Sequence, residues 1–314
     1  MPENKIEKRS WTSKEQRLLF VFFIVLVGSS AAVQSAIIAL GAKYMWVSTL
    51  SWMPALSAVL ALWVTKSDQG ILGLRGSQRR WYLLGWATPI IYMAAIAALI
   101  IFGGLGWFDI GAYANKVGRN LGISNWSYEQ ILVLSLPWIV TIGVIKSLVT
   151  TLGEEIGMRG LLVPLFYKRF GFINTSFLSG LIWVLWYSPI ILWGGYHAKL
   201  QGFDQTALPL MVFAITTVSL SFPLAYLRLR SGSLWPSAIF HAVHNAILLS
   251  IMGWYLSAKK QTIIMIDGFG SVSPTGEFGY GLAGISILVA VCYCWLAYRD
   301  GMIGRKKETE FDGT

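Results

Sequence analysis

The stretch that decides the fold is residues 131–160, ILVLSLPWIVTIGVIKSLVTTLGEEIGMRG. Its apolar part contains one charged side chain, Lys146. A run of about 20 such residues is what an α-helix needs to cross the ~30 Å hydrocarbon core of a bilayer. Glu154, Glu155 and Arg159 follow directly. Ionisable side chains at membrane depth are costly, so they usually face the interior of a helix bundle and serve a function. The stretch therefore predicts a membrane helix that carries a polar site.

The whole chain has the composition of a polytopic membrane protein. Of its 314 residues 55% are hydrophobic and 13% are charged, whereas soluble domains average about 25% charged residues. We expect an all-α fold with about eight transmembrane helices, near residues 18–40, 45–65, 82–104, 131–152, 174–194, 207–227, 234–256 and 279–298. The fourth helix should continue past the glutamates to about Phe166. A single transmembrane domain (18–298) is expected between a basic N-terminal segment (1–17) and a tail (299–314).

The distribution of basic residues predicts the orientation of these helices. If the N-terminus is cytoplasmic, the inner segments hold 18 of the 25 Lys and Arg residues and the outer loops hold 6. Cytoplasmic loops of membrane proteins carry such an excess, so both termini are expected in the cytoplasm. The net charge of +10 then reflects contact with anionic lipid headgroups rather than nucleic acid.

The two glutamates are expected to differ in their surroundings. Glu155 and Arg159 are four residues apart, the spacing of an ion pair on a helix. Glu154 is rotated from Glu155 by about 100° and lacks that partner, so its carboxylate is available to take a proton from water. The alternative is a cluster of charges where the helix ends at the headgroups, and position alone does not separate the two.

A second polar cluster lies in the seventh expected helix. The segment SLWPSAIFHAVHN, residues 233–245, contains His241, His244 and Asn245. His241 and Asn245 are four residues apart and share a face, and His244 is about 60° from His241. A neutral histidine and an asparagine amide can both donate hydrogen bonds to a developing oxyanion. The alternative is polar contacts that hold helices together. The third histidine, His197, is expected at the surface of an outer loop.

Together, these motifs resemble those of the CPBP family of intramembrane proteases, which includes the CAAX prenyl endopeptidases and bacterial relatives linked to bacteriocin maturation or immunity. The segment EEIGMRG fits E-E-x-x-x-R and HAVHN fits H-x-x-x-N, in that order along the chain. SLWPSAIFHAVHN and PTGEFG (Pro274–Gly279) also look like stretches of bacterial members. The resemblance covers about residues 130–280. It implies an integral protein of a bacterial cytoplasmic membrane.

The resemblance also implies a role for each matching residue. Glu154 is expected to activate water, and Glu155 and Arg159 complete the first motif. His241 and Asn245 are expected to polarise the scissile carbonyl and hold its oxyanion. His244, beside them on the same helix, is a supporting residue. The implied substrate is a hydrophobic or prenylated peptide.

One position departs from the pattern of this family. The second motif is typically W-x-x-W-H-x-P, but IWVLWYSPI (182–190) has Tyr187 where the histidine is expected. A catalytic zinc usually needs three His, Glu or Cys ligands, and Glu154, His241 and His244 form a poor set. We therefore expect no metal or other cofactor and treat Glu154 as a general base. Tyr187 is expected to line the site and to act as a hydrogen-bond donor.

Three functions remain open on the sequence. The first is an intramembrane endopeptidase with Glu154-activated water and His241 and Asn245 at the oxyanion. The second is a non-catalytic membrane protein on the same scaffold, such as a bacteriocin immunity or regulatory partner, because loss of one positioned donor typically costs ~10²–10³ in rate. The third is a transporter, which the absence of an internal repeat disfavours. The role of Lys146 is not assigned.

Overall fold

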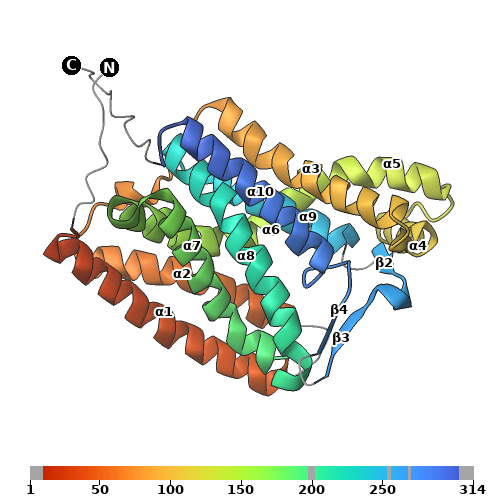
Figure 1. Ribbon diagram of the computed structural model, residues 1–314, viewed down its shortest axis with the longest axis horizontal. Coiled ribbons are helices and arrows are strands. Elements are labelled where there is room, and N and C mark those ends of the chain that lie inside the picture. Colours follow the sequence, from red (N-terminus) through yellow and green to blue (C-terminus); the bar gives the residue numbers. More distant parts are fainter. Residues whose placement is uncertain (1–9, 197–201, 253–255, 268–269, 304–314) are drawn as a thin grey trace, which may run out of the picture.

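The computed structural model describes residues 10–196, 202–252, 256–267 and 270–303, and His197 lies outside them. The long helices form one bundle (Figure 1). Its helices are α1 (Ser13–Leu40), α2 (Tyr44–Val64), α3 (Arg79–Phe102), α4 (Ile110–Leu121), α5 (Tyr128–Trp138), α6 (Val144–Glu155), α7 (Val163–Leu192), α8 (Phe203–Ser231), α9 (Trp235–Ile247) and α10 (Tyr280–Arg299). Short 3₁₀ turns form η1 (Gln69–Leu72) and η5 (Lys260–Thr262). Single π-helical turns form η2 (Ile139–Gly143), η3 (Ile156–Leu162) and η4 (Leu248–Met252).

The strands are short and lie in the loops at one end of the bundle (Figure 1). Strand β1 (Gly106–Phe108) pairs antiparallel with β2 (Leu256–Ala258). Strand β3 (Ile264–Ile266) pairs antiparallel with β4 (Gly270–Val272), which leads into α10. The fold is otherwise helical, as the composition predicts.

Membrane-spanning helices account for most of the described chain. Six helical stretches in it are long and apolar enough to cross a membrane. One of them, Tyr128–Leu192, is 65 residues long and contains both the fourth and the fifth expected spans. The seventh expected span corresponds to α9 and η4 and is not among the six, because its histidines and asparagine lower its hydropathy. The chain is therefore the polytopic membrane protein that the sequence predicts.

The fourth expected span continues as helix beyond Phe166, through η3 and into α7. A break comes at Gly171, whose φ of 71° and ψ of −179° lie outside the helical region. Glycine adopts this conformation without the steric cost that a Cβ would add. Residues 153–173, which join the fourth and fifth expected spans, are thus a bent helix, and the bend turns the chain back into the bundle.

The beginning of α1 and the end of α10 lie at the same end of the bundle (Figure 1). Because both points lie on the same side, the chain between them crosses the membrane an even number of times. The side of the membrane that this end faces stays a prediction from the basic residues.

Two glycines bring α2 against the helix that carries the glutamates. A Cβ added at Gly153 would lie 2.4 Å from the Ser51 carbonyl oxygen, and one at Gly157 would lie 2.4 Å from Pro54 Cβ and 2.7 Å from the Pro54 oxygen. Contacts under 3 Å with backbone or with a proline ring force the helices apart. The backbones touch here because neither residue has a side chain, and this contact places Ser51 beside Glu154.

We expect Gly157→Ala to lower the free energy of unfolding by about 1–3 kcal/mol, the usual range for overpacking a filled site. Gly28→Ala is the matched control, because Gly28 lies in α1 with nothing within 4 Å of an added Cβ. That control should be neutral or stabilising by about 0.5–1 kcal/mol, since alanine favours a helix over glycine. Thermal unfolding of the three proteins in one detergent measures the difference. Equal midpoints for the two variants would contradict the close contact.

Candidate active site

Glu154, at the end of α6, is surrounded by hydrogen-bond donors. Its Oε1 accepts hydrogen bonds from Ser51 Oγ and from the Tyr187 hydroxyl, each at 2.9 Å, and its Oε2 accepts one from Trp183 Nε1 at 2.9 Å. The residue is 3% exposed. A set of three donors suits the ionised carboxylate, which can only accept. Both oxygens of Glu154 therefore accept hydrogen bonds from protein donors.

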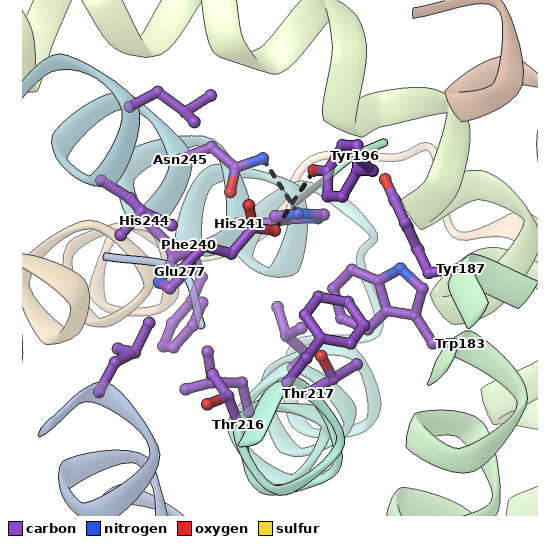
Figure 2. A pocket seen from close by; sticks show the side chains of 16 residues that line it. Trp183, Tyr187, Tyr196, Thr216, Thr217, Phe240, His241, His244, Asn245 and Glu277 are labelled. Atoms are coloured by element: carbon purple, nitrogen blue, oxygen red, sulfur yellow. Dashed lines mark hydrogen bonds between the residues drawn. The ribbon is translucent and has the colours of Figure 1, made fainter. Parts of the chain in front are cut away.

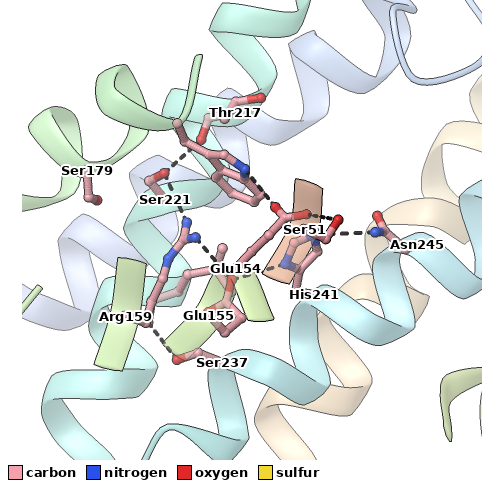
Figure 3. Close-up of polar contacts among 12 residues, drawn as sticks. Ser51, Glu154, Glu155, Arg159, Ser179, Thr217, Ser221, Ser237, His241 and Asn245 are labelled. Atoms are coloured by element: carbon pink, nitrogen blue, oxygen red, sulfur yellow. Dashed lines mark hydrogen bonds and ion pairs between the residues drawn. The ribbon is translucent and has the colours of Figure 1, made fainter. Parts of the chain in front are cut away.

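Glu155 faces the other side of the same helix and forms the predicted ion pair. Its Oε1 lies 3.0 Å from Arg159 Nη1, and both side chains are fully buried. Arg159 also donates to Ser221 Oγ at 3.2 Å and stacks over the Trp183 ring at 4.3 Å (Figure 3). Among the described residues, Glu155 Oε2 and Arg159 Nε have no hydrogen-bond partner. The pair is buried, tightly packed and incompletely satisfied.

The helix that joins the two glutamates to α7 is wound more loosely than an α-helix. Arg159 lies in η3, and π-helical turns of this kind are frequent at functional sites. The Arg159 carbonyl oxygen accepts a hydrogen bond from Arg228 Nε at 3.0 Å, and Arg228 Nη2 donates to the Ile71 oxygen at 2.6 Å. A buried arginine of α8 thus ties η3 to η1, between α2 and α3.

His241 connects the two motifs. Its Nδ1 lies 3.0 Å from Glu155 Oε1, and its Nε2 lies 3.4 Å from Asn245 Nδ2 (Figure 3). Because a carboxylate accepts, the Nδ1 atom carries the proton, and Nε2 of the neutral ring is an acceptor. The expectation that neutral His241 donates to an oxyanion therefore needs revision. The neutral ring orients the Asn245 amide, and it donates from Nε2 only after it gains a second proton.

His244 lies on the other flank of α9. Its Nδ1 is hydrogen-bonded to the hydroxyl of Tyr92, a residue of α3. The contact ties α9 to α3.

One pocket joins most of these groups (Figure 2). Its empty volume, which includes space open to solvent, is about 660 Å³. The polar residues that line it are Trp183, Tyr187, Tyr196, Thr216, Thr217, His241, His244, Asn245 and Glu277, and the apolar ones are Phe213, Leu220, Leu224, Phe240, Leu248, Leu249 and Leu282. Glu154 is not among the lining residues. It lies behind Tyr187 and Trp183, which both line the pocket and both donate to its carboxylate.

Sequence analysis missed three residues of the site. Ser51 comes from α2, far from any motif, and only its place beside a glycine contact brings it to Glu154. Glu277 lies in the PTGEFG segment, which was noted for its resemblance but was given no role. Tyr196, in the loop after α7, donates to Glu277 Oε1 at 3.3 Å. The signal for Glu277 was an acidic residue between two glycines just before an apolar span.

The donor arrangement does not fit a metal ion at Glu154. All three neighbours of its carboxylate present N–H or O–H groups, and a cation would face these hydrogens. Across the described ranges, no three His, Cys, Asp or Glu side chains come together as a group that could hold a metal.

Lys146 is exposed on α6, between Ile145 and Val149, which are 62% and 59% exposed. It therefore faces away from the buried glutamates.

Residues 136–247 match the family model described as type II CAAX prenyl endopeptidase Rce1-like. Residues 136–247, which we call the CAAX-protease core, are therefore similar to this protease family. No curated protein matches the chain. The CAAX-protease core contains Glu154, Tyr187, His241 and Asn245, whereas Ser51 and Glu277 lie outside the matched residues. The family acts within membranes on prenylated or hydrophobic peptides, which agrees with a polar site inside an apolar bundle.

Proposed function

We propose that the protein is an intramembrane endopeptidase that cleaves a hydrophobic or lipidated peptide. The observation that carries this proposal is the pocket in which Tyr187, His241 and Asn245 meet, with Glu154 directly behind Tyr187. These groups come from three helices of a CAAX-protease core. Burial away from bulk water strengthens hydrogen bonds to charge that develops during a reaction.

Tyr187 links the pocket to Glu154 in this proposal. The Tyr187 hydroxyl donates to Glu154 Oε1, and its oxygen can accept a hydrogen bond from a water molecule in the pocket. As the water attacks a peptide carbonyl, its proton passes to the tyrosine oxygen while the tyrosine proton passes to Glu154. The phenol is regenerated, and Glu154 is the final proton acceptor.

Asn245 and His241 would serve the carbonyl oxygen. One hydrogen of Asn245 Nδ2 points to His241 Nε2 at 3.4 Å, which leaves the second for the oxyanion. His241 is held in turn by Glu155 through Nδ1. The hydrogen bonds from Glu155 through His241 to Asn245 thus fix an amide donor before the reaction begins. Such preorganised donors typically contribute a factor of about 10²–10³ in rate.

The apolar wall of the pocket supports a substrate delivered by the membrane. Leu249 lines the pocket and is 57% exposed, so this wall reaches the lipid-facing surface. A hydrophobic segment or prenyl chain could enter here without crossing water. We place the protein in a bacterial cytoplasmic membrane, with both termini inside.

The direct test is cleavage by the purified protein in liposomes. The panel should pair each peptide with and without a prenyl group and with and without a hydrophobic segment. We expect cleavage of the hydrophobic or prenylated members and none of the polar ones. Failure of every member would overturn the proposed function.

Tyr187→Phe is expected to lower kcat by about 10²–10³, because the relay loses its hydroxyl. Tyr226→Phe is the matched control, since its hydroxyl binds Asp300 at 2.8 Å and Tyr226 does not line the pocket. That control should change stability but not kcat. A Tyr187→Phe enzyme with wild-type kcat would contradict the relay.

A non-catalytic membrane protein, such as a bacteriocin immunity or regulatory partner, is the second candidate. It is favoured by the tyrosine at position 187 and by the protein donors that reach both Glu154 oxygens. On this hypothesis the wild type cleaves nothing, and Glu154→Gln, His241→Ala and Tyr187→His keep full function in cells. A gain of cleavage in Tyr187→His would indicate a decayed active site. The same liposome assay separates the two candidates.

A further inference from the structure

One carboxyl group, that of Glu277, lines the pocket from outside the CAAX-protease core. It lies in the turn between β4 and α10, which is ordered by hydrogen bonds from Gly279 N to the Gly276 oxygen at 3.1 Å and from Tyr280 N to the Ser273 oxygen at 3.0 Å. Gly276 has a φ of 82°, which favours glycine. The turn therefore holds the Glu277 side chain in a fixed position among the lining residues (Figure 2).

Glu277 and Glu154 have opposite surroundings. Glu154 accepts from three donors at 2.9 Å. Within the part of the chain that the structure describes, one donor, the Tyr196 hydroxyl, reaches Glu277, at 3.3 Å. The pocket wall also contains Phe213, Phe240 and several leucines. With three donors, the Glu154 carboxyl group is the better proton acceptor, and with one long hydrogen bond the Glu277 carboxyl group is the better proton donor.

The titration of Glu277 agrees with this contrast. Burial raises the pKa of Glu277 to about 7; the hydrogen bond from Tyr196 lowers it, the charge of Glu154 raises it, and His241 lowers it. The other titratable side chains that line the pocket are Tyr187 and His244. A carboxyl group that is protonated up to neutral pH, close to one that is held as an acceptor, is the pattern of an acid and a base with separate tasks.

Peptide cleavage in this pocket needs a proton donor. Glu154, through Tyr187, removes a proton from water, but the leaving amine must also be protonated. We propose that Glu277 is the general acid of the peptidase and protonates the leaving amine; this rests on the proposed function. When the tetrahedral intermediate collapses, an oxyanion lone pair re-forms the carbonyl bond and the C–N bond breaks. Its electron pair takes the Glu277 proton. One proton then returns from Glu154 through the Tyr187 hydroxyl and pocket water to Glu277, which restores both groups.

The leaving group provides the sharpest test. An alkoxide leaving group with electron-withdrawing substituents needs no acid, whereas an amine does. We therefore compare a cleaved peptide with its analogue in which an activated ester replaces the scissile bond. Glu277→Gln is expected to lower kcat for the peptide by about 10²–10⁴ and to change kcat for the ester by less than about threefold. Glu277→Asp should retain part of the peptide activity.

The pH profile gives a second readout. For the wild type, kcat for the peptide should be highest below pH 7 and fall as pH rises through about 7, because the acid must be protonated. This decline should be missing for the ester and for Glu277→Gln. Glu129→Gln, an exposed position on α5, is the control and should match the wild type throughout.

The outcomes are distinct. A Glu277→Gln enzyme that cleaves the peptide at the wild-type rate overturns the inference and leaves the proposed function standing. Equal losses on peptide and ester, or a change confined to KM, show a structural or binding role and also overturn it. A wild type that cleaves neither substrate overturns the proposed function and this inference with it.

Discussion

Replacement of Glu154 by glutamine is expected to reduce kcat for peptide cleavage by about 10²–10⁴, the contribution of a positioned general base. The amide cannot take a proton from Tyr187. Its NH₂ group would also face the N–H and O–H groups that now donate to the carboxylate from Ser51, Tyr187 and Trp183. At least one of these hydrogen bonds must be lost or reversed. The loss of kcat should therefore exceed the loss caused by removing any one of these three donors.

Single-turnover cleavage at saturating peptide measures this effect directly, because it separates the chemical step from product release. Ser51→Ala is the companion variant. It removes one of three donors but keeps the carboxylate, so its kcat should fall by less than about tenfold. Equal kcat values for Glu154→Gln and the wild type would exclude Glu154 as the base.

Replacement of Arg159 by methionine is expected to give the largest loss of stability, about 3–5 kcal/mol. The change leaves Glu155 fully buried without its cation, and an uncompensated buried charge has this cost. The Arg159 contacts with Ser221 and with the Trp183 ring are lost as well. Adding Glu155→Gln should recover part of the loss, because the isolated charge is then removed.

The chain offers a matched control for that variant. Lys168 and Glu15 form an ion pair with the same 3.0 Å separation, but Lys168 is 55% exposed. Exposed pairs contribute about 0–1 kcal/mol, so Lys168→Met should barely change the unfolding midpoint. Denaturant or thermal unfolding in a single detergent compares the stabilities of the two variants. Similar midpoints for Arg159→Met and Lys168→Met would mean that the buried pair is not important for stability.

Local sequence predicted the contacts that lie within one helix. The Glu155–Arg159 pair and the shared face of His241 and Asn245 follow from a spacing of four residues, and the structure contains both contacts. Apolar length predicted the membrane spans in the same way. These features depend on the geometry of a single helix, which short-range spacing determines.

Contacts between helices could not be predicted from residue spacing within one helix. Ser51 and Glu277 reach the site only through tertiary packing, and no local pattern separates Ser51 from other polar residues in membrane proteins. The tautomer of His241 is also a tertiary property, because it depends on Glu155 approaching its Nδ1 atom. The bend at Gly171 was missed because a single glycine in an apolar run is compatible with a continuous helix as well as with a break.

The glycine contact between α2 and the glutamate helix has a consequence for how this protein could be modified. Ser51 belongs to the hairpin formed by α1 and α2, which precedes residues 136–247 in the chain. Exchange of that hairpin alone would change the number of donors around the base without altering any motif residue. The N-terminal hairpin can therefore tune the reactivity of a centre whose chemistry is encoded elsewhere.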